Sequence, residues 1–149
     1  MIELGQYNHL SVARDTEVGI FLQDEEEQVV LLPGKFIPEG GLEVGDFIDV
    51  FVYKDNEGRD IATTQKSKIT VDSFALLEVR SVDKFGAFLE MGLDKDLFVP
   101  FMEQNKKMQV GEKHVVFMYI DAMTDRLAGS AKLEQFLENE AIDLVEGQT

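Results

Sequence analysis

The chain has 149 residues, of which 44% are hydrophobic and 29% charged, a composition typical of a folded protein rather than a disordered one. It contains no cysteine, which excludes disulfides, thiolate metal sites and cysteine nucleophiles. Its formal net charge is −15, from 14 basic and 29 acidic residues, which on charge alone favours a protein-binding role over a nucleic-acid one.

Targeting and catalytic patterns are missing from the sequence. No apolar run approaches the roughly 18 residues of a membrane span, and the N-terminus has no signal-peptide pattern, so we expect a cytoplasmic protein without a membrane partner. We find no nucleophile–base–acid set and no phosphate-binding glycine loop. The two histidines, His9 and His114, are too distant in sequence to indicate a metal site. We therefore expect a protein that is not an enzyme and has no cofactor or metal.

The first part of the chain has the pattern of a small barrel. Alternating apolar residues and turn residues predict short strands at about 8–14, 18–22, 31–33, 48–53 and 59–64. Five strands within about 65 residues, with no long helix, are typical of a closed or partly closed barrel, which leaves no exposed strand edges.

The next part of the chain repeats the first. Gly45–Asp55 aligns with Gly111–Asp121 at an offset of 66, and Val18–Leu22 aligns with Phe85–Leu89 at an offset of 67. A single-residue indel before Gly45 and Gly111 explains the change of offset. We therefore predict two tandem barrels, domain 1 at residues 1–68 and domain 2 at residues 69–132, with a short linker near residues 66–72.

The last stretch differs from both units. Leu133, Phe136 and Leu137 fall on one stripe of a helix, so we expect a short amphipathic C-terminal helix. Val145 and Gly147 resemble the opening of another unit. Residues 133–149 are thus expected to hold this helix and the start of a third repeat.

The long strand of each unit alternates aliphatic and aromatic residues. With Val50 and Val52 pointing inward, Phe51 and Tyr53 are expected to face outward, and Phe117 repeats this in the second unit. An outward aromatic row is either a nucleic-acid platform or a packing surface between the barrels or beneath a loop. We favour the packing surface.

Several of these motifs resemble a known family. Phe85-Gly86-Ala87-Phe88, the strand that ends in Val99-Pro100, the Val110-Gly111-Glu112 turn and the closing Asp121…Arg126 turn resemble the S1 RNA-binding domain. The order of the units resembles the conserved virulence factor B family, which strings S1-like repeats together. The resemblance implies an all-β chain of two five-stranded oligonucleotide-binding (OB) folds. It also implies binding of single-stranded RNA with little sequence preference, in post-transcriptional or virulence gene regulation.

The same resemblance implies an RNA site in the second unit. Bases would stack on Phe85 and Phe88, beside Asp121 and Arg126 at the last turn, with help from Lys84. Residues three apart on a plain strand point to opposite faces, so we expect a bulge at the intervening Gly86 that brings both phenylalanines to one face. The alternative is that one phenylalanine belongs to the core.

The first unit matches the RNA-binding pattern less well. Val18 replaces the first phenylalanine, which leaves Phe21, although Asp55 and Arg59 keep the turn pair. S1 domains carry a histidine on the third strand, where this chain has Pro100 and, in unit one, Pro33. Unit two is therefore the better RNA-binding candidate.

Local charge supports the same choice between the units. Residues 1–68 hold six basic and fourteen acidic residues, or −8, whereas residues 69–132 hold eight and ten, or −2. The alternative function is an acidic protein-interaction module that has lost RNA binding and meets a basic RNA-handling protein. RNA binding requires Phe85 and Phe88 to be exposed together, with basic side chains within about 10 Å. A buried phenylalanine, or a ring of acids, would favour the alternative.

Overall fold

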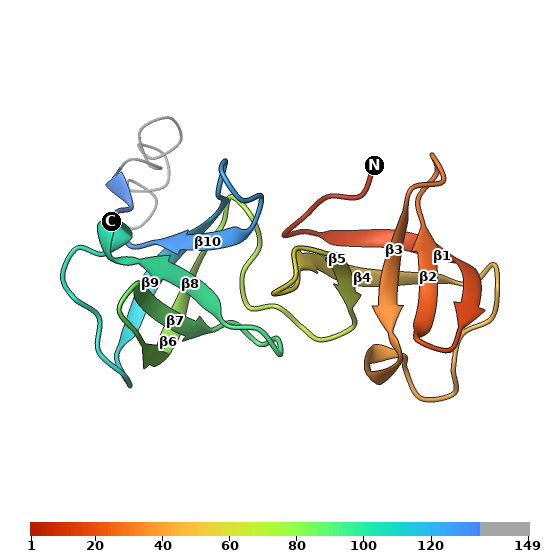
Figure 1. Ribbon diagram of the computed structural model, residues 1–149, viewed down its shortest axis with the longest axis horizontal. Coiled ribbons are helices and arrows are strands. Elements are labelled where there is room, and N and C mark those ends of the chain that lie inside the picture. Colours follow the sequence, from red (N-terminus) through yellow and green to blue (C-terminus); the bar gives the residue numbers. More distant parts are fainter. Residues whose placement is uncertain (135–149) are drawn as a thin grey trace, which may run out of the picture.

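The computed structural model describes residues 1–134 and shows two β-barrels side by side (Figure 1). Barrel one comprises β1 (Tyr7–Thr16), β2 (Gly19–Gln23), β3 (Val29–Pro33), β4 (Phe47–Lys54) and β5 (Asp60–Thr63). Barrel two comprises β6 (Phe74–Val82), β7 (Gly86–Glu90), β8 (Leu97–Pro100), β9 (Lys113–Ile120) and β10 (Leu127–Ser130). A 3₁₀ helix follows the third strand of each barrel, η1 (Gly34–Phe36) and η2 (Phe101–Glu103).

Each barrel is a closed sheet with the strand order of an OB fold. In barrel one the order is β1-β2-β3-β5-β4, with β4 paired back onto β1, and barrel two repeats it as β6-β7-β8-β10-β9. The third and fifth strands run parallel and all other neighbours run antiparallel. The prediction of two all-β, five-stranded barrels is confirmed. The predicted C-terminal helix and third repeat lie, except for residues 133 and 134, outside the described residues.

The barrel interiors are filled by the aliphatic residues that the alternation predicted. Val50 and Val52 of β4 are fully buried, as is Met118 of β9. Leu22 and Leu89 occupy the same place in the second strand of each barrel and are also fully buried. The repeat in the sequence is thus a repeat of the core.

The bulge that curves each barrel lies in its first strand. The register between β1 and β2 shifts between Val12 and Arg14, and that between β6 and β7 shifts between Val79 and Ser81. The expectation of a bulge at Gly86 is wrong, because Gly86 pairs directly with Pro100. The first strand pairs with both the second and the fourth, so it carries the bend that closes the barrel.

A second indel also separates the two units. Strand β5 begins at Asp60 and β10 at Leu127, which restores the offset to 67 after the value of 66 between β4 and β9. The turn from Asp121 to Arg126 is therefore one residue longer than the turn from Asp55 to Arg59. The longer turn belongs to the barrel that carries the candidate site.

The outward-facing aromatic residues of the long strands are covered by other parts of the chain rather than exposed as a platform. Phe51 is fully buried and Tyr53 and Phe117 are nearly so. The edge of Tyr7 packs on Phe51 with ring centroids 5.6 Å apart, and Phe74 packs on Phe117 at 4.9 Å. The favoured alternative, a packing surface, describes these residues.

Backbone hydrogen bonds join the N-terminal segment to the linker between the barrels. The Gly5 N–H donates to the Val52 carbonyl of β4 at 2.7 Å, and the Gly5 carbonyl accepts from the Val71 N–H at 2.8 Å. The Tyr7 hydroxyl accepts from the Ser67 N–H at 2.9 Å. The N-terminal segment therefore connects β4 of barrel one to the linker that leads into barrel two.

Glu90, at the end of β7, anchors the linker to barrel two. Its carboxylate pairs with Lys68 of the linker and accepts the Gly92 N–H, with Arg80 3.7 Å away. The Lys68 hydrogen bond lowers the pKa of Glu90 below its ordinary value of 4.5, against the opposing effect of burial, and the Gly92 N–H lowers it further. This carboxylate therefore contributes stability above its ordinary pKa, and that contribution is lost as the pH falls through the lower, folded value.

We expect Glu90→Gln to lower the free energy of unfolding at neutral pH by less than about 1 kcal/mol, because solvent screens the pair. The difference from wild type should shrink as the pH falls below 4.5 and the wild-type carboxyl becomes protonated. Urea denaturation of both proteins, repeated from neutral to acidic pH, measures this difference in the free energy of unfolding. A difference that stayed constant into acid would contradict the assigned role of the charge.

Two further properties bear on function. No helix within residues 1–134 is long and apolar enough to cross a membrane. In the same part of the chain, no three His, Asp or Glu side chains gather in a way that would hold a metal ion.

Candidate nucleic-acid interface

A cavity of about 440 Å³ opens where barrel two meets barrel one, and we call it the junction cavity. Phenylalanines from barrel two form one side of the cavity. Asn56, from the β4–β5 turn of barrel one, lies on another side. Its lining residues are Asn56, Phe85, Phe88, Lys95, Asp96, Phe98, Asp121, Thr124, Arg126, Leu127 and Ala128.

Phe85 and Phe88 reach the junction cavity by different routes. Phe88 points outward from β7, between the buried side chains of Ala87 and Leu89. Phe85 precedes β7, in a turn where its N–H donates to Asp83 Oδ1 at 2.7 Å, and its side chain is 64% exposed. Because Phe85 lies outside the strand, alternation does not apply to it, and the two rings share a face without a bulge.

A third phenylalanine completes the apolar side. Phe98 lies directly opposite Phe88 in the β7–β8 pairing, and the two ring centroids are 5.2 Å apart. Both rings are half-buried, whereas Phe85 stands free in solvent. Phe88 and Phe98 are therefore held in place by packing, whereas Phe85 is an exposed ring beside them.

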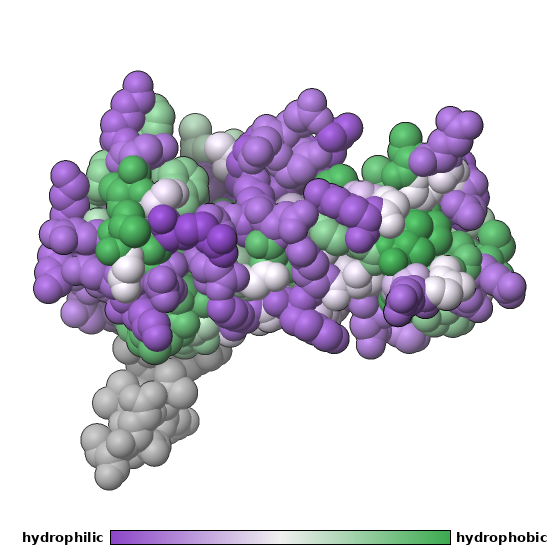
Figure 2. All heavy atoms as spheres, turned by 90° about the horizontal axis from the view of Figure 1, so that it is seen from below, coloured by the Kyte–Doolittle hydropathy of each residue, from purple (hydrophilic) through white to green (hydrophobic). Residues whose placement is uncertain are grey.

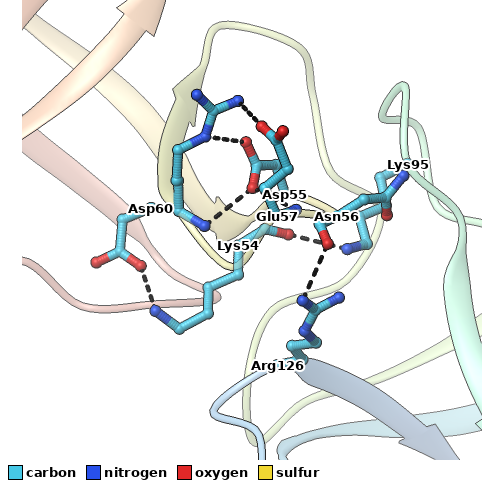
Figure 3. Close-up of polar contacts among 8 residues, drawn as sticks. Lys54, Asp55, Asn56, Glu57, Asp60, Lys95 and Arg126 are labelled. Atoms are coloured by element: carbon cyan, nitrogen blue, oxygen red, sulfur yellow. Dashed lines mark hydrogen bonds and ion pairs between the residues drawn. The ribbon is translucent and has the colours of Figure 1, made fainter.

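One cation lies against these rings, and two more line the same cavity. Lys84 Nζ lies 5.2 Å from the centroid of Phe85. Lys95 Nζ donates to the Lys54 carbonyl at 3.0 Å, and Arg126 Nη2 donates to the Asn56 carbonyl at 3.1 Å (Figure 3). Burial lowers the pKa of Lys95, the nearby Arg126 lowers it further, and Asp55 partly offsets both.

The carboxylates at the junction cavity have structural partners. Asp121 Oδ1 accepts the Met123 N–H at 2.8 Å and so shapes the turn before β10. Asp96 lies 3.3 Å from Arg80, and burial raises the pKa of Asp96. Asp96 and Asp121 thus line the junction cavity together with the phenylalanines, and Asp55 and Asp94 line a second cavity that Phe88 also borders.

The two candidate residues of barrel one lie apart from the others, around a separate cavity of about 560 Å³. Phe21 is covered by the Arg14 guanidinium, 4.5 Å from its centroid. Arg59 is held by Asp55 at 2.9 Å and Glu57 at 2.5 Å. The structure thus brings Lys84, Phe85, Phe88, Asp121 and Arg126 together and leaves Phe21 and Arg59 elsewhere.

Sequence reasoning missed seven of the eleven lining residues, of which Phe98, Lys95 and Asn56 matter most for the site. Phe98 could have been found, because a hairpin that pairs Gly86 with Pro100 also places residue 98 opposite residue 88. Lys95 and Asn56 carried no comparable signal, since they meet only where the two barrels pack.

The face seen in Figure 2 is largely hydrophilic, with separate hydrophobic patches over both barrels. This pattern fits sites of limited size better than one continuous apolar interface.

The architecture defines a tandem OB-fold protein with an aromatic and cationic surface on its second barrel. Comparison with known proteins agrees with the fold of barrel one, because residues 4–65 match the family model of the S1 domain. Barrel one therefore matches the S1-domain family, and the chain is similar over most of its length to proteins called conserved virulence factor B.

Individual relatives show the extent of this similarity. "Conserved virulence factor B" of Staphylococcus aureus is 29% identical over 132 residues, which cover 78% of this chain and 44% of the relative. "Uncharacterized protein YitL" of Bacillus subtilis is 33% identical over 96 residues, covering 64% and 32%. The chain thus spans less than half the length of these relatives.

The structural match extends over almost the whole chain. A crystal structure of a Streptococcus pneumoniae protein, described as multidomain with nucleic acid binding domains, superposes with a TM-score of 0.70 at 22% identity. The match covers 91% of this chain and 48% of that one. At this identity the likeness concerns the fold.

Proposed function

We propose that the chain binds single-stranded RNA through barrel two, weakly and with little sequence preference. The observation that carries the proposal is the junction cavity, which three phenylalanines and the cations Lys95 and Arg126 line, with Lys84 next to Phe85. Aromatic rings accept any base as a stacking partner, at about 1–3 kcal/mol per base, and the cations suit the phosphates. The site residues are Phe85, Phe88, Arg126, Asp121 and Lys84, with Phe98 and Lys95 added from the structure.

The relationship to S1-domain proteins supports a nucleic acid as the ligand. The pneumococcal structural neighbour, which is described as having nucleic acid binding domains, supports the same ligand. A role in post-transcriptional or virulence gene regulation, in the cytoplasm, rests on the relationship to conserved virulence factor B. The weak barrel-two site would gain affinity from further modules of a longer chain, because linked sites act at high effective concentration.

Salt dependence tests this proposal quantitatively. With Lys84, Lys95 and Arg126 as phosphate contacts, the log-log slope of affinity against salt should be about −2. The measurement is fluorescence anisotropy of a labelled mixed-sequence RNA of about 12 nucleotides, within the range bound by OB folds. Affinity that was absent at low salt would contradict the proposal.

Arg126→Ala should weaken binding and make the salt slope shallower by about 0.7, because one phosphate contact is lost. The matched control is Arg14→Ala, which removes the guanidinium that lies over Phe21 in barrel one. The control should keep the wild-type slope. Equal slopes for all three proteins would remove Arg126 from the site.

A second candidate function follows from the charge of barrel one. Residues 1–68 carry −8, and Glu25, Glu26 and Glu27 are all exposed at the β2–β3 turn. A basic protein that handles RNA would be attracted to this surface. Binding of a basic peptide, without RNA binding at low salt, would favour this function over the first.

A further inference from the structure

Barrel one supplies part of the wall of the junction cavity. Asn56, an exposed residue in the β4–β5 turn, lines this cavity and an adjoining one of about 480 Å³, which Tyr53 and Asp55 also line. Phe88 and Lys95 line both cavities as well. A molecule lying on the phenylalanines of barrel two would therefore also meet the turn of barrel one.

The two cations at this junction are held by neutral acceptors. Figure 3 shows Lys95 and Arg126 reaching from barrel two toward backbone carbonyls of the turn, those of Lys54 and Asn56. Within residues 1–134 neither cation makes an ion pair, whereas Lys54 and Arg59 on the same turn are paired with acids. Charge-assisted bonds to an anion are about twice as strong as bonds to neutral acceptors, so a phosphate would displace the carbonyls.

Asn56 has unused hydrogen-bonding capacity. Its backbone carbonyl accepts from Arg126, but its side-chain amide makes no hydrogen bond to any other residue that the structure describes. The turn itself is fixed, because Asp55 Oδ1 accepts the N–H groups of Glu57 and Arg59, each at 2.9 Å. A side-chain amide offers one acceptor and two donors, which complement the edges of nucleobases.

We propose that the junction cavity is a composite site for one nucleotide of a single strand, built from both barrels. Barrel two stacks the base on its phenylalanines and holds the adjoining phosphate with Lys95 and Arg126. Barrel one closes the site with its β4–β5 turn and presents the Asn56 amide to the edge of the base. This inference rests on the proposed RNA-binding function and adds to it a site that neither barrel forms alone.

The test is a change from amide to carboxylate at Asn56 in the intact chain, with the labelled RNA as the probe. Asn56→Asp adds a negative charge beside Arg126 and repels the phosphate, so we expect binding at low salt to weaken by about tenfold. The matched control is Gln109→Glu, the same chemical change at an exposed loop position outside the junction cavity. The control should bind within about twofold of wild type, since its added charge is exposed to solvent and does not line the cavity.

The outcomes separate this inference from the proposed function. Loss of affinity in Asn56→Asp but not in Gln109→Glu supports the composite site. Equal affinities of these two variants, while Phe85→Ala/Phe88→Ala loses binding, would overturn the composite site and leave the proposed function intact. If the Phe85→Ala/Phe88→Ala variant bound RNA like wild type, both the composite site and the proposed function would be contradicted. Asn56→Ala adds a second readout, because it should reduce the small differences in affinity among uridine, adenosine and cytidine homopolymers.

Discussion

Gly86→Ala should lower the free energy of unfolding by about 1–3 kcal/mol, the usual cost of overpacking a tight contact. A Cβ atom at this position would lie 2.4 Å from the Val99 carbonyl oxygen and 2.8 Å from Pro100 Cα, both in the backbone of β8. It would also lie 3.0 Å from the ring of Phe98. Because backbone atoms cannot swing aside as a side chain can, β7 and β8 must separate to admit it.

The matched control for this variant is Gly34→Ala. A Cβ atom at Gly34 would meet nothing within 4 Å, and the backbone there is outside the left-handed region. We expect it to be neutral or slightly stabilising, by up to about 1 kcal/mol. Urea denaturation followed by circular dichroism measures both variants. A Gly86→Ala protein as stable as Gly34→Ala would show that the β7–β8 contact, and with it the placement of Phe98, is looser than described.

Phe85→Ala/Phe88→Ala should weaken RNA binding by about 30-fold or more, since two stacked bases contribute at least about 2 kcal/mol together. The variant should still fold, because Phe85 is 64% exposed and Phe88 only half-buried. Anisotropy with the labelled RNA measures the loss, and circular dichroism confirms the fold.

Phe47→Ala is the matched control for this loss. Phe47 is 65% exposed, as Phe85 is, but it lies in barrel one and stacks on His9 with ring centroids 5.1 Å apart. Its removal should leave RNA affinity unchanged. Equal losses in the control and the double variant would mean that exposed aromatics anywhere on the chain bind RNA, and the assigned site would be wrong.

The fold was predictable because the repeat shows it twice. The offsets of 66 and 67 align core residues such as Val52 and Met118, so each unit supports the strand pattern of the other. The burial of Phe51 was not predictable from alternation alone. A strand has two faces, and only the path of the N-terminal segment, through Tyr7, decides that the second face is covered as well.

The candidate site was predictable in part. The family resemblance pointed to Phe85, Phe88 and Arg126, and the structure places them around one cavity. The reason given for the shared face was wrong, because the strand begins one residue after Phe85 and the bulge lies in the preceding strand. Contacts between the barrels could not be predicted from the sequence, because Asn56 and Arg126 are 70 residues apart and meet only through packing of the two barrels.

The most direct test of the central claim is to map the bound RNA on the protein by nuclear magnetic resonance. Amide shifts of the isotope-labelled chain would be followed as the RNA of about 12 nucleotides is added at low salt. We predict that the largest changes fall on Phe85, Gly86 and Phe88, on Lys95 and Phe98, and on the turn before β10. Changes confined to barrel one or to other surfaces, or no changes at all, would contradict RNA binding at this site.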